Sequence, residues 1–453
     1  MARDLARRSP LSSARRSVAG LAAAACIALG PALAAAAAPD PEIAALVAQV
    51  DPARYAAHLQ ALVGPRATPA ERAAARAYVE QQLASFGYAT SVDAQENVAA
   101  LRPGSITPSV RWLVGAHYDA VPGSPGADDN ASGVAGLLEI ARVLAGAELE
   151  AGVEIVAFGL EEVGLVGSGF YAANAAAAGR DIRAAVAFDM IAYTTATQFV
   201  VPPEVEGCFD TSDTAGLDRT ANWIGALASD APLRDAYVAA AQTYVPALRV
   251  EWGVVADGTG LCFPFVPGFG NLLRRSDHVG FWDRGYRGML LTDTAELRNP
   301  NYHKASDTIA TLDQPFALNV TRATLAFLAA SAGVLAGPDV DVDGVANAAD
   351  NCPFVANAGQ QDTGGLGAAS PPNGVGDACE CGDVTGDGFV TLVDSVSISR
   401  ALLVPPTATL AQPALCDVGG SPGCTVADAV LVRRALLAPP TATLSARCGR
   451  PAP

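Results

Sequence analysis

The composition of this chain changes abruptly after Gly337, and this change divides the 453 residues into two kinds of structure. From about Pro39 to Ala336, apolar runs with the periodicity of strands or helices follow one another. After Gly337, glycine, proline, aspartate and asparagine dominate, and long apolar periods are absent until Leu392. A chain of this length is expected to form two or more domains. We therefore predict one large domain followed by a tail of small modules.

The segment before Gly337 has the pattern of an α/β domain. Apolar residues at helical spacing cover 53–87, with a capped helix start at Thr68. The expected strands are 97–101, 111–115, 154–159, 184–193 and 288–294, and the later helices are 133–146, 231–245 and 314–335. Alternation of buried strands with helices predicts a mixed, mostly parallel central sheet with helices on both faces.

The first 38 residues have the layout of a secretory signal peptide. Arginines precede an apolar run from Val18 to about Leu33, and cleavage is expected at 36–38. The run is shorter than the ~20 residues that a membrane span needs, and no other segment is long and apolar enough. Arg15-Arg16 leaves a twin-arginine signal open beside a general secretory signal. We therefore expect a secreted, periplasmic or cell-surface protein.

Net charge and cysteine usage are consistent with an exported, cation-binding protein. A net charge of -17 without a basic stripe argues against nucleic acid as a partner. Once Cys26 leaves with the signal peptide, an even number of cysteines remains, which suits disulfides. Cys208 and Cys262 lie in the body. The tail holds the others: Cys352, Cys379, Cys381, Cys416, Cys424 and Cys448. A small apolar core needs such cross-links, and calcium as well.

Acidic residues and histidines recur where the predicted strands end. His117 and Asp119 follow the strand 111–115, within the stretch GAHYDAVPGSPGADDNASG. Comparable positions are occupied by Asp129, Glu161, Glu162, Asp189 and His303. Ligand sites of open α/β sheets lie at the carboxyl ends of strands. So many carboxylates in one cleft would raise one another's pKa values unless cations bind between them. The sequence therefore predicts a metal site.

These motifs, in this order, resemble the M28 family of zinc exopeptidases. The matching stretches are HYD, GADDNASG, FGLEEVGLVGS, AFDMIAY and NYHKASDT, with RRSDHVGFWDRGYRGMLLTD as a further segment. The resemblance covers about 41–335 and implies hydrolysis of the N-terminal peptide bond of peptide substrates, as in an aminopeptidase. Three alternatives stay open: a glutaminyl cyclase, a carboxypeptidase-like enzyme of the same fold, and a noncatalytic calcium-dependent binding protein.

The resemblance implies two zinc ions bridged by the carboxylate of Asp129. His117 and Asp189 would hold one ion, and Glu162 and His303 would hold the other. Imidazole and carboxylate ligands in this mixture suit Zn²⁺ with open positions for water.

The resemblance also assigns roles beside the ligands. Glu161 would be the general base, which takes a proton from the water between the ions and returns it to the leaving amine. Asp119 would accept the other ring N–H of His117. His278, in the SDH motif, is expected to line the substrate pocket. The peptide bond after Asp129 is expected to be cis.

Three further positions receive no metal role from the sequence. We expect Asp128 to be a polar loop residue and His58 to be a partly exposed helix residue. Leu273 occupies the position where some family aminopeptidases carry a tyrosine that stabilises the tetrahedral intermediate. The substrate preference is therefore left open.

Residues 339–380 resemble a thrombospondin type 3 repeat. In such repeats, aspartates at alternating positions bind calcium through side-chain and backbone oxygens, which are the ligands that calcium prefers. The candidate ligands are Asp339, Asp341, Asp343 and Asp350. The resemblance pairs Cys352 with Cys379. A solvated acidic linker is the alternative.

Residues 382–403 resemble a dockerin-type calcium loop and helix, and the unit is duplicated. RALLVPPTATL at Arg400 recurs as RALLAPPTATL at Arg434, an offset of 34 residues. The expected calcium ligands of the first loop are Asp383, Thr385, Asp387, Thr391 and Asp394. The second copy keeps Asp417 and Asp428 but lacks the other ligands, so we predict that it binds calcium poorly.

The remaining cysteines and the module boundaries complete the prediction. Cys416 and Cys424 bracket the second loop, where a disulfide would take the place of the ion, and Cys381 would pair with Cys448. The dockerin resemblance implies a cohesin-like protein as partner of the tail. The predicted parts are the signal peptide 1–38, the metallopeptidase domain 39–336, the thrombospondin type 3-like repeat 337–380 and the dockerin-like module 381–453.

Overall fold

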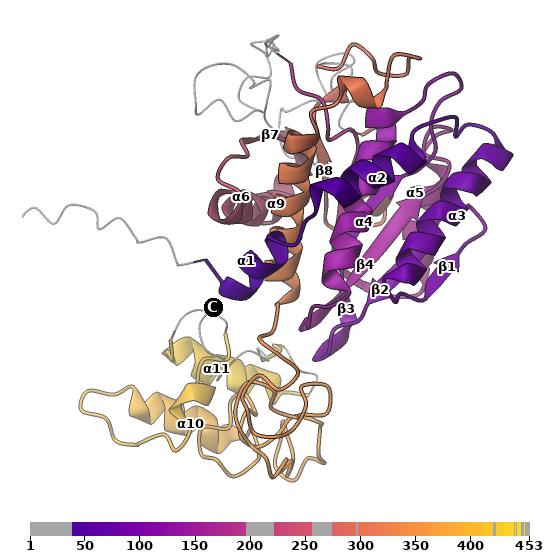
Figure 1. Ribbon diagram of the computed structural model, residues 1–453. Coiled ribbons are helices and arrows are strands. Elements are labelled where there is room, and N and C mark those ends of the chain that lie inside the picture. The colour runs from indigo at the N-terminus through magenta and orange to yellow at the C-terminus, as the bar shows by residue number, and fades with distance from the viewer. Residues whose placement is uncertain are drawn as a thin grey trace, which may run out of the picture. The chain divides into compact units, whose positions relative to one another are not determined.

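The computed structural model describes most of the body and the tail (Figure 1). The described residues are 39–195, 222–255, 274–295, 298–419, 423–438, 440, 442–444 and 448. The predicted signal peptide, Cys208, Cys262 and Leu273 lie outside them. Among the described helices, none has the length and apolarity that a membrane span requires.

An eight-stranded sheet forms the centre of the body, in the order β1-β2-β4-β3-β5-β8-β6-β7. The strands are β1 Thr90–Val92, β2 Val98–Arg102, β3 Thr107–His117, β4 Ala151–Phe158, β5 Asp181–Phe188, β6 Asn222–Leu227, β7 Val250–Val255 and β8 Gly288–Thr292. β3 pairs in parallel with β4 and β5, and β5 pairs in parallel with β8. β2 is antiparallel to β1 and β4, and β8 is antiparallel to β6. The prediction of a mixed, mostly parallel sheet is confirmed.

Helices cover both faces of this sheet, as Figure 1 shows. The helices of the body are α1 Pro41–Val47, α2 Pro52–Leu62, α3 Pro69–Ser85, α4 Gly133–Leu144, α5 Val166–Ala177, α6 Ala231–Tyr244, α8 His278–Trp282 and α9 Gln314–Ala332. The large core lies on one face, where α4 and α9 pack with Val114 and Ala116 of β3. Leu113 points to the other face, toward α5 and α8. Successive strand side chains alternate between faces, so one strand serves both cores.

Local sequence signals explain where several helices begin. Thr68 caps α3, and the side chain of Glu71 reaches back to the backbone of Thr68, which is the predicted capping box. Asp51 caps α2 and Asp313 caps α9, each directly before a helix with proline in its first turn. The sequence did not predict α1, α5, α8, β1, β6 or β7. These elements are short or, as in α5, rich in alanine and glycine, so their apolar periodicity is weak.

The tail has little regular structure and a small core of its own. Its described α-helices are α10 Leu392–Ala401 and α11 Val426–Ala435, and both begin with a capping box. The core consists of Val384, Val390, Ile398, Leu415, Val418 and Val432 with three half-cystines. The hydroxyl of Ser395 in α10 donates to the carbonyl of Ala429 in α11 at 2.8 Å. The predicted limits of the individual modules stay predictions.

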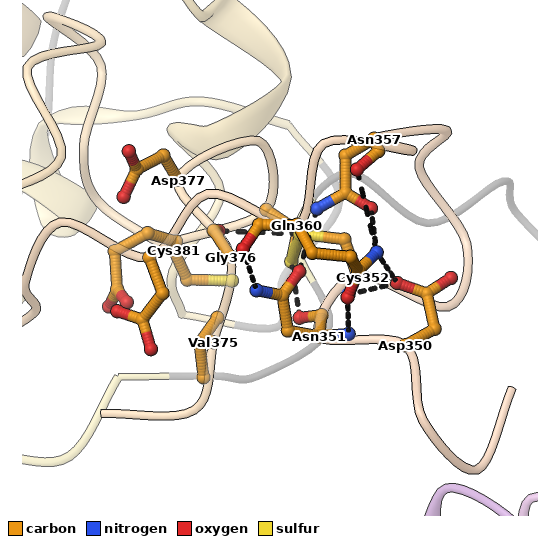
Figure 2. Close-up of a disulfide and its surroundings, with 12 residues drawn as sticks. Asp350, Asn351, Cys352, Asn357, Gln360, Val375, Gly376, Asp377 and Cys381 are labelled. Carbon is orange, nitrogen blue, oxygen red and sulfur yellow. Dashed lines mark hydrogen bonds between the residues drawn. A yellow bond between two sulfur atoms is a disulfide. The ribbon is translucent and has the colours of Figure 1, made fainter. Parts of the chain in front are cut away.

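Three disulfides cross-link the tail, and each was predicted. They join Cys352 to Cys379, Cys381 to Cys448, and Cys416 to Cys424. Figure 2 shows Asp350, Asn351 and Gln360 around the first of them. Asp350 accepts the backbone N–H of Cys352 at 2.8 Å and the amide of Gln360 at 2.7 Å. Polar side chains therefore order the backbone here, where apolar packing is scarce.

Candidate metal centre

Most of the side chains with metal-binding chemistry come from the ends of parallel strands. His117 is the last residue of β3, Asp189 directly follows β5, and Glu161 and Glu162 come shortly after β4. Because these strands are parallel, their carboxyl ends lie at one edge of the sheet. The predicted strand ended at residue 115, but β3 continues to His117, so the strand itself fixes that imidazole.

Asp129 and His303 reach the same edge from loops. Asp129 lies in the π-helical turn η1, Ala127–Ser132, directly before α4. Its peptide bond to Asn130 is cis, which confirms the prediction. The Asn130 side chain donates to the carbonyl of Phe188 at 2.8 Å, which ties this turn to the end of β5. His303 lies between β8 and α9.

The two oxygens of Asp129 face different imidazoles. Oδ1 lies 3.4 Å from Nε2 of His117, and Oδ2 lies 3.1 Å from Nε2 of His303. Asp189 Oδ1 is 3.5 Å from Nε2 of His117, and Glu162 Oε2 is 3.3 Å from Nε2 of His303. The structure thus brings all five predicted ligands together, in the two sets that the resemblance implies and with one carboxylate between them.

The donor atoms are close enough to hold metal ions. Ligand atoms of His117, Glu161 and Asp189 all lie within 4.8 Å of one another, and so do those of His117, Asp129 and Glu162. Glu162 Oε1 is buried and has no hydrogen-bond partner among the described residues. Such an oxygen costs about 1–3 kcal/mol unless something binds it. Imidazole nitrogens with carboxylate oxygens are the donor set of zinc, so these residues fit that ion.

Burial and mutual contacts shift the pKa values of these groups strongly. Burial raises the pKa of Glu161 well above its usual range, and Asp189 adds to this while His117 opposes it. Burial would also raise the pKa of Asp129, but the contacts with His117 and His303 hold it well below its usual range. Burial lowers the pKa of His303, yet Asp129 and Glu162 outweigh it and raise the pKa to about 10.

Asp119 orients more of the site than the sequence indicated. Its Oδ1 lies 3.5 Å from Nδ1 of His117, a nitrogen without a hydrogen-bond partner among the described residues, so acceptance of that N–H stays a prediction. Oδ1 also accepts the backbone N–H of Glu161 and Oδ2 accepts that of Glu162, both at 3.1 Å. One buried carboxylate beside His117 therefore fixes the backbone of both glutamates.

Asp128 lies in the turn before α4, as predicted, but it is also a buried part of this centre, which the sequence did not indicate. It is fully buried and accepts the side-chain amide of Asn299 at 2.6 Å and the backbone N–H of Ala192 at 3.0 Å. Burial raises its pKa, and the neighbouring Asp293 raises it further. Asp307 accepts the backbone N–H groups of Asp128 and Asp129 at 2.9 and 3.2 Å. The sequence shows adjacent acids here but not their burial.

Arg66 is a second residue that the sequence reasoning missed. Its guanidinium is buried and donates to backbone carbonyls, including those of Tyr118 at 2.7 Å, Pro125 at 2.9 Å and Gly126 at 2.6 Å. It thereby holds the loop that leads from β3 to Asp129. Burial lowers its pKa to about 10 against the pull of nearby carboxylates, Asp129 first among them. A lone arginine before a helix gives no sequence signal of this role.

Two further histidines are buried. His58 is only 4% exposed and contacts the Tyr78 hydroxyl through Nδ1 at 2.8 Å, so the prediction of a partly exposed residue was wrong. Its ring lies between Tyr78 of α3 and Glu139 of α4, whose Oε1 is 4.0 Å from Nε2, and the packing of these helices covers it. His278 is fully buried in α8, with its ring edge-to-face against Trp282 at 4.3 Å. Its role in a substrate pocket stays a prediction.

Known protein families match both parts of the chain. Residues 97–249 match peptidase family M28, and residues 338–360 match the thrombospondin type 3 repeat. Aminopeptidase YwaD of Bacillus subtilis is 43% identical over 82 residues, which are 18% of this chain and 18% of that protein. The chain spans less than two thirds of the length of the curated relatives that it matches.

Solved structures share the fold of the body. LapB from Legionella pneumophila has a TM-score of 0.52 at 23% identity, with coverage of 65% of this chain and 75% of that chain. Macrostomum lignano glutaminyl cyclase has a TM-score of 0.50 at 16% identity, with coverage of 67% and 96%. Identities this low show a common fold and nothing about activity. Within a body of this fold, the chain thus carries a segment, residues 97–249, that matches peptidase family M28, and a match to the thrombospondin type 3 repeat follows it.

Proposed function

We propose that the body is a two-zinc exopeptidase that removes N-terminal residues from peptides. The observation that carries this proposal is the position of Asp129, whose Oδ1 faces His117 and whose Oδ2 faces His303. Asp189 and Glu162 complete the two ligand sets. A carboxylate between two such sets is suited to two cations, because each oxygen can serve one of them.

In this proposal the five ligands hold zinc and the neighbouring residues do the remaining work. Bound zinc would lower the pKa of the attacking water and polarise the peptide carbonyl. Asp119 keeps His117 and both glutamates in place through its contacts with the ring and with two backbone N–H groups. Arg66 and Asp307 fix the backbone on either side of Asp129.

Glu161 is the proposed general base. It is buried beside His117 and Asp189, and burial raises the pKa of its carboxyl group. A carboxylate with a raised pKa accepts a proton from water more readily and can hold it until the leaving amine takes it up. Its neighbour Glu162 faces His303 instead, so the two adjacent glutamates have different tasks.

Aminopeptidase activity is favoured over the other activities of this fold. The similarity to a named aminopeptidase supports it, whereas the fold itself is shared with a glutaminyl cyclase. The complete pair of ligand sets supports two zinc ions. The position of Glu161 at the metal centre argues against a protein that only binds.

We further propose export and calcium binding by the tail. Three disulfides support an oxidising destination. The thrombospondin type 3 match and the clustering of Asp339, Asp341 and Asp343 within 4.8 Å support calcium in that repeat. The dockerin-like loops and a cohesin-like partner stay predictions from the resemblance.

The test combines a metal count with four substrates. Zinc is counted per purified chain, and hydrolysis is followed on a peptide with a free amino terminus and on the same peptide with a blocked one. A third peptide begins with glutamine, and a fourth has a blocked carboxyl terminus. Two zinc ions with cleavage only at free amino termini are expected. Cyclisation of glutamine, or cleavage that needs a free carboxyl terminus, would replace the aminopeptidase assignment.

A further inference from the structure

The two histidines of the metal centre are held in different ways. The side chain of His117 is only 1% exposed, and its second ring nitrogen faces Asp119 at 3.5 Å. The side chain of His303 is 35% exposed. Both carboxylate contacts of its ring run through Nε2, toward Asp129 and Glu162. Metal-bound histidines are normally oriented through the other ring nitrogen, and the contact beside the His303 ring is of a different kind.

The neighbouring aromatic ring provides such a contact. Tyr302 stacks on His303 with ring centroids 3.7 Å apart and ring planes 23° from parallel. At this separation the imidazole cannot turn far without colliding with the phenol ring. Tyr302 is held in turn by Arg275, whose Nη2 donates to the phenol oxygen at 2.7 Å. The Arg275 guanidinium also lies 5.8 Å from the centre of the Tyr302 ring.

The loop that carries these rings is fixed at both ends to the segment of Asp129. At one end, Asn299 donates to Asp128 at 2.6 Å. At the other end, Asp307 accepts the backbone N–H groups of Asp128 and Asp129. The backbone around His303 is therefore anchored, and the main freedom left is rotation of its side chain.

We propose that Tyr302 is a positioning residue that aims Nε2 of His303 at the metal between Asp129 and Glu162, and that Arg275 keeps Tyr302 in place. This inference rests on the proposed two-zinc function. A freely turning His303 ring would spend less time in the ligand orientation. Loss of the stack therefore weakens zinc at the His303 position and spares zinc at the His117 position.

The test measures metal binding directly, without any substrate. Full-length wild type, Tyr302→Leu and Tyr302→Phe are stripped of metal and titrated with Zn²⁺ against a coloured chelator, so that the two dissociation constants are resolved. Tyr302→Leu is expected to weaken one zinc roughly tenfold, the lower end of the range for loss of an orienting partner. Tyr302→Phe keeps the aromatic face and stays within about threefold of wild type.

A neighbouring variant serves as the control. Lys304 follows His303, is exposed and donates to the carbonyl of Pro300 at 2.6 Å. Lys304→Ala disturbs the same loop without touching the stack, so both zinc affinities should match wild type. Cobalt(II) in place of zinc gives a second readout, since the visible absorption of one site should change in Tyr302→Leu only.

The outcomes separate the inference from the function on which it rests. Unchanged binding of both ions by Tyr302→Leu would overturn the positioning role, and so would equal weakening at both positions or by both Tyr302 variants. A wild-type chain that binds fewer than two zinc ions would instead contradict the proposed two-zinc function. In that case an unaltered affinity in Tyr302→Leu of an ion held at the His303 position still counts against the role of Tyr302.

Discussion

The body and the tail of this chain both gather carboxylates, but in opposite surroundings. Asp129 and Glu161 are 4% and 8% exposed, and imidazoles lie beside them. The aspartates of the cluster at Asp339, Asp341 and Asp343 are partly exposed, and the tail contains no histidine. Buried carboxylates need a partner that compensates for lost hydration, whereas exposed ones keep water. The body therefore favours a permanent zinc centre, and the tail favours a reversible hard cation.

The two regions also differ in what fixes the carboxylates. In the body, strand ends and buried residues such as Asp119 and Arg66 hold them in position. In the tail, the loops fold around them: Asp383 accepts the backbone N–H groups of Gly386 at 2.7 Å and Gly388 at 2.8 Å. The proposed zinc ligands are therefore supported by a large core, and the calcium-type loops depend on local bonds and disulfides.

The largest expected effect is the loss of peptide hydrolysis when one carboxylate of the body is removed. Glu161→Gln should retain both zinc ions and lose activity roughly 10²–10⁴-fold, because the proposed base is removed while the five ligands stay. Peptide hydrolysis and metal content are measured on the same preparation. Glu80→Gln, a partly exposed glutamate of α3 that pairs with Arg76, is the control and should keep full activity. Near-normal turnover in Glu161→Gln would remove Glu161 from the role of base.

Acid should destabilise the body through a buried histidine, a residue type that the tail lacks. Burial lowers the pKa of His58 to about 4, below its ordinary value of 6.5. The folded state thus binds a proton at His58 less well than the unfolded state does. Neutral His58 therefore makes its full contribution to the free energy of unfolding above pH 6.5, and this contribution is lost as the pH falls toward 4. At pH 4 the loss is about 3 kcal/mol. The free energy of unfolding of the body is compared between wild type and His58→Gln, and equally steep declines would contradict the prediction.

Truncation and calcium binding should show that the body and the tail fold independently of each other. A chain that ends at Ala336 is expected to fold and to hydrolyse peptides, because the core and all zinc ligands precede that residue. In the full chain, calcium at 100 times its dissociation constant should stabilise the tail alone by about 2.7 kcal/mol. Thermal unfolding is recorded with and without calcium at concentrations of chelator that spare zinc. A single transition shifted by calcium, or a soluble but inactive truncated chain, would mean that the tail is part of the catalytic unit.

The smallest expected effect is a change in the number of calcium ions bound by the duplicated loops of the tail. Asp383→Asn should abolish one calcium-binding event, because this residue opens the first loop and its carboxylate is enclosed by backbone N–H groups. Asp417→Asn, the equivalent change in the second loop, should leave the number of bound ions unchanged, since the Cys416–Cys424 disulfide closes that loop. Titration calorimetry with calcium counts the ions. Loss of an ion in Asp417→Asn would make the second loop a calcium site.

The sequence by itself indicated the α/β body, the place of its metal-type residues and the presence of disulfides in the tail, while the resemblance supplied the pairing of Cys352 with Cys379. Those features have local signals: an apolar strand just before His117, capping residues such as Thr68, and cysteines in an even number. Because parallel strands end at one edge, residues far apart in the sequence could be expected to meet there. The ligand sets themselves came from resemblance to a family.

Only the tertiary structure decided which polar groups lie in the interior. The sequence gives no sign that His58 and Asp128 are buried, that Arg66 holds the loop before Asp129, or that Tyr302 stacks on His303. Each of these facts depends on the packing of elements distant in sequence, since a side chain's exposure is set by what covers it. Charge and polarity describe a residue alone, whereas desolvation and pKa belong to its surroundings.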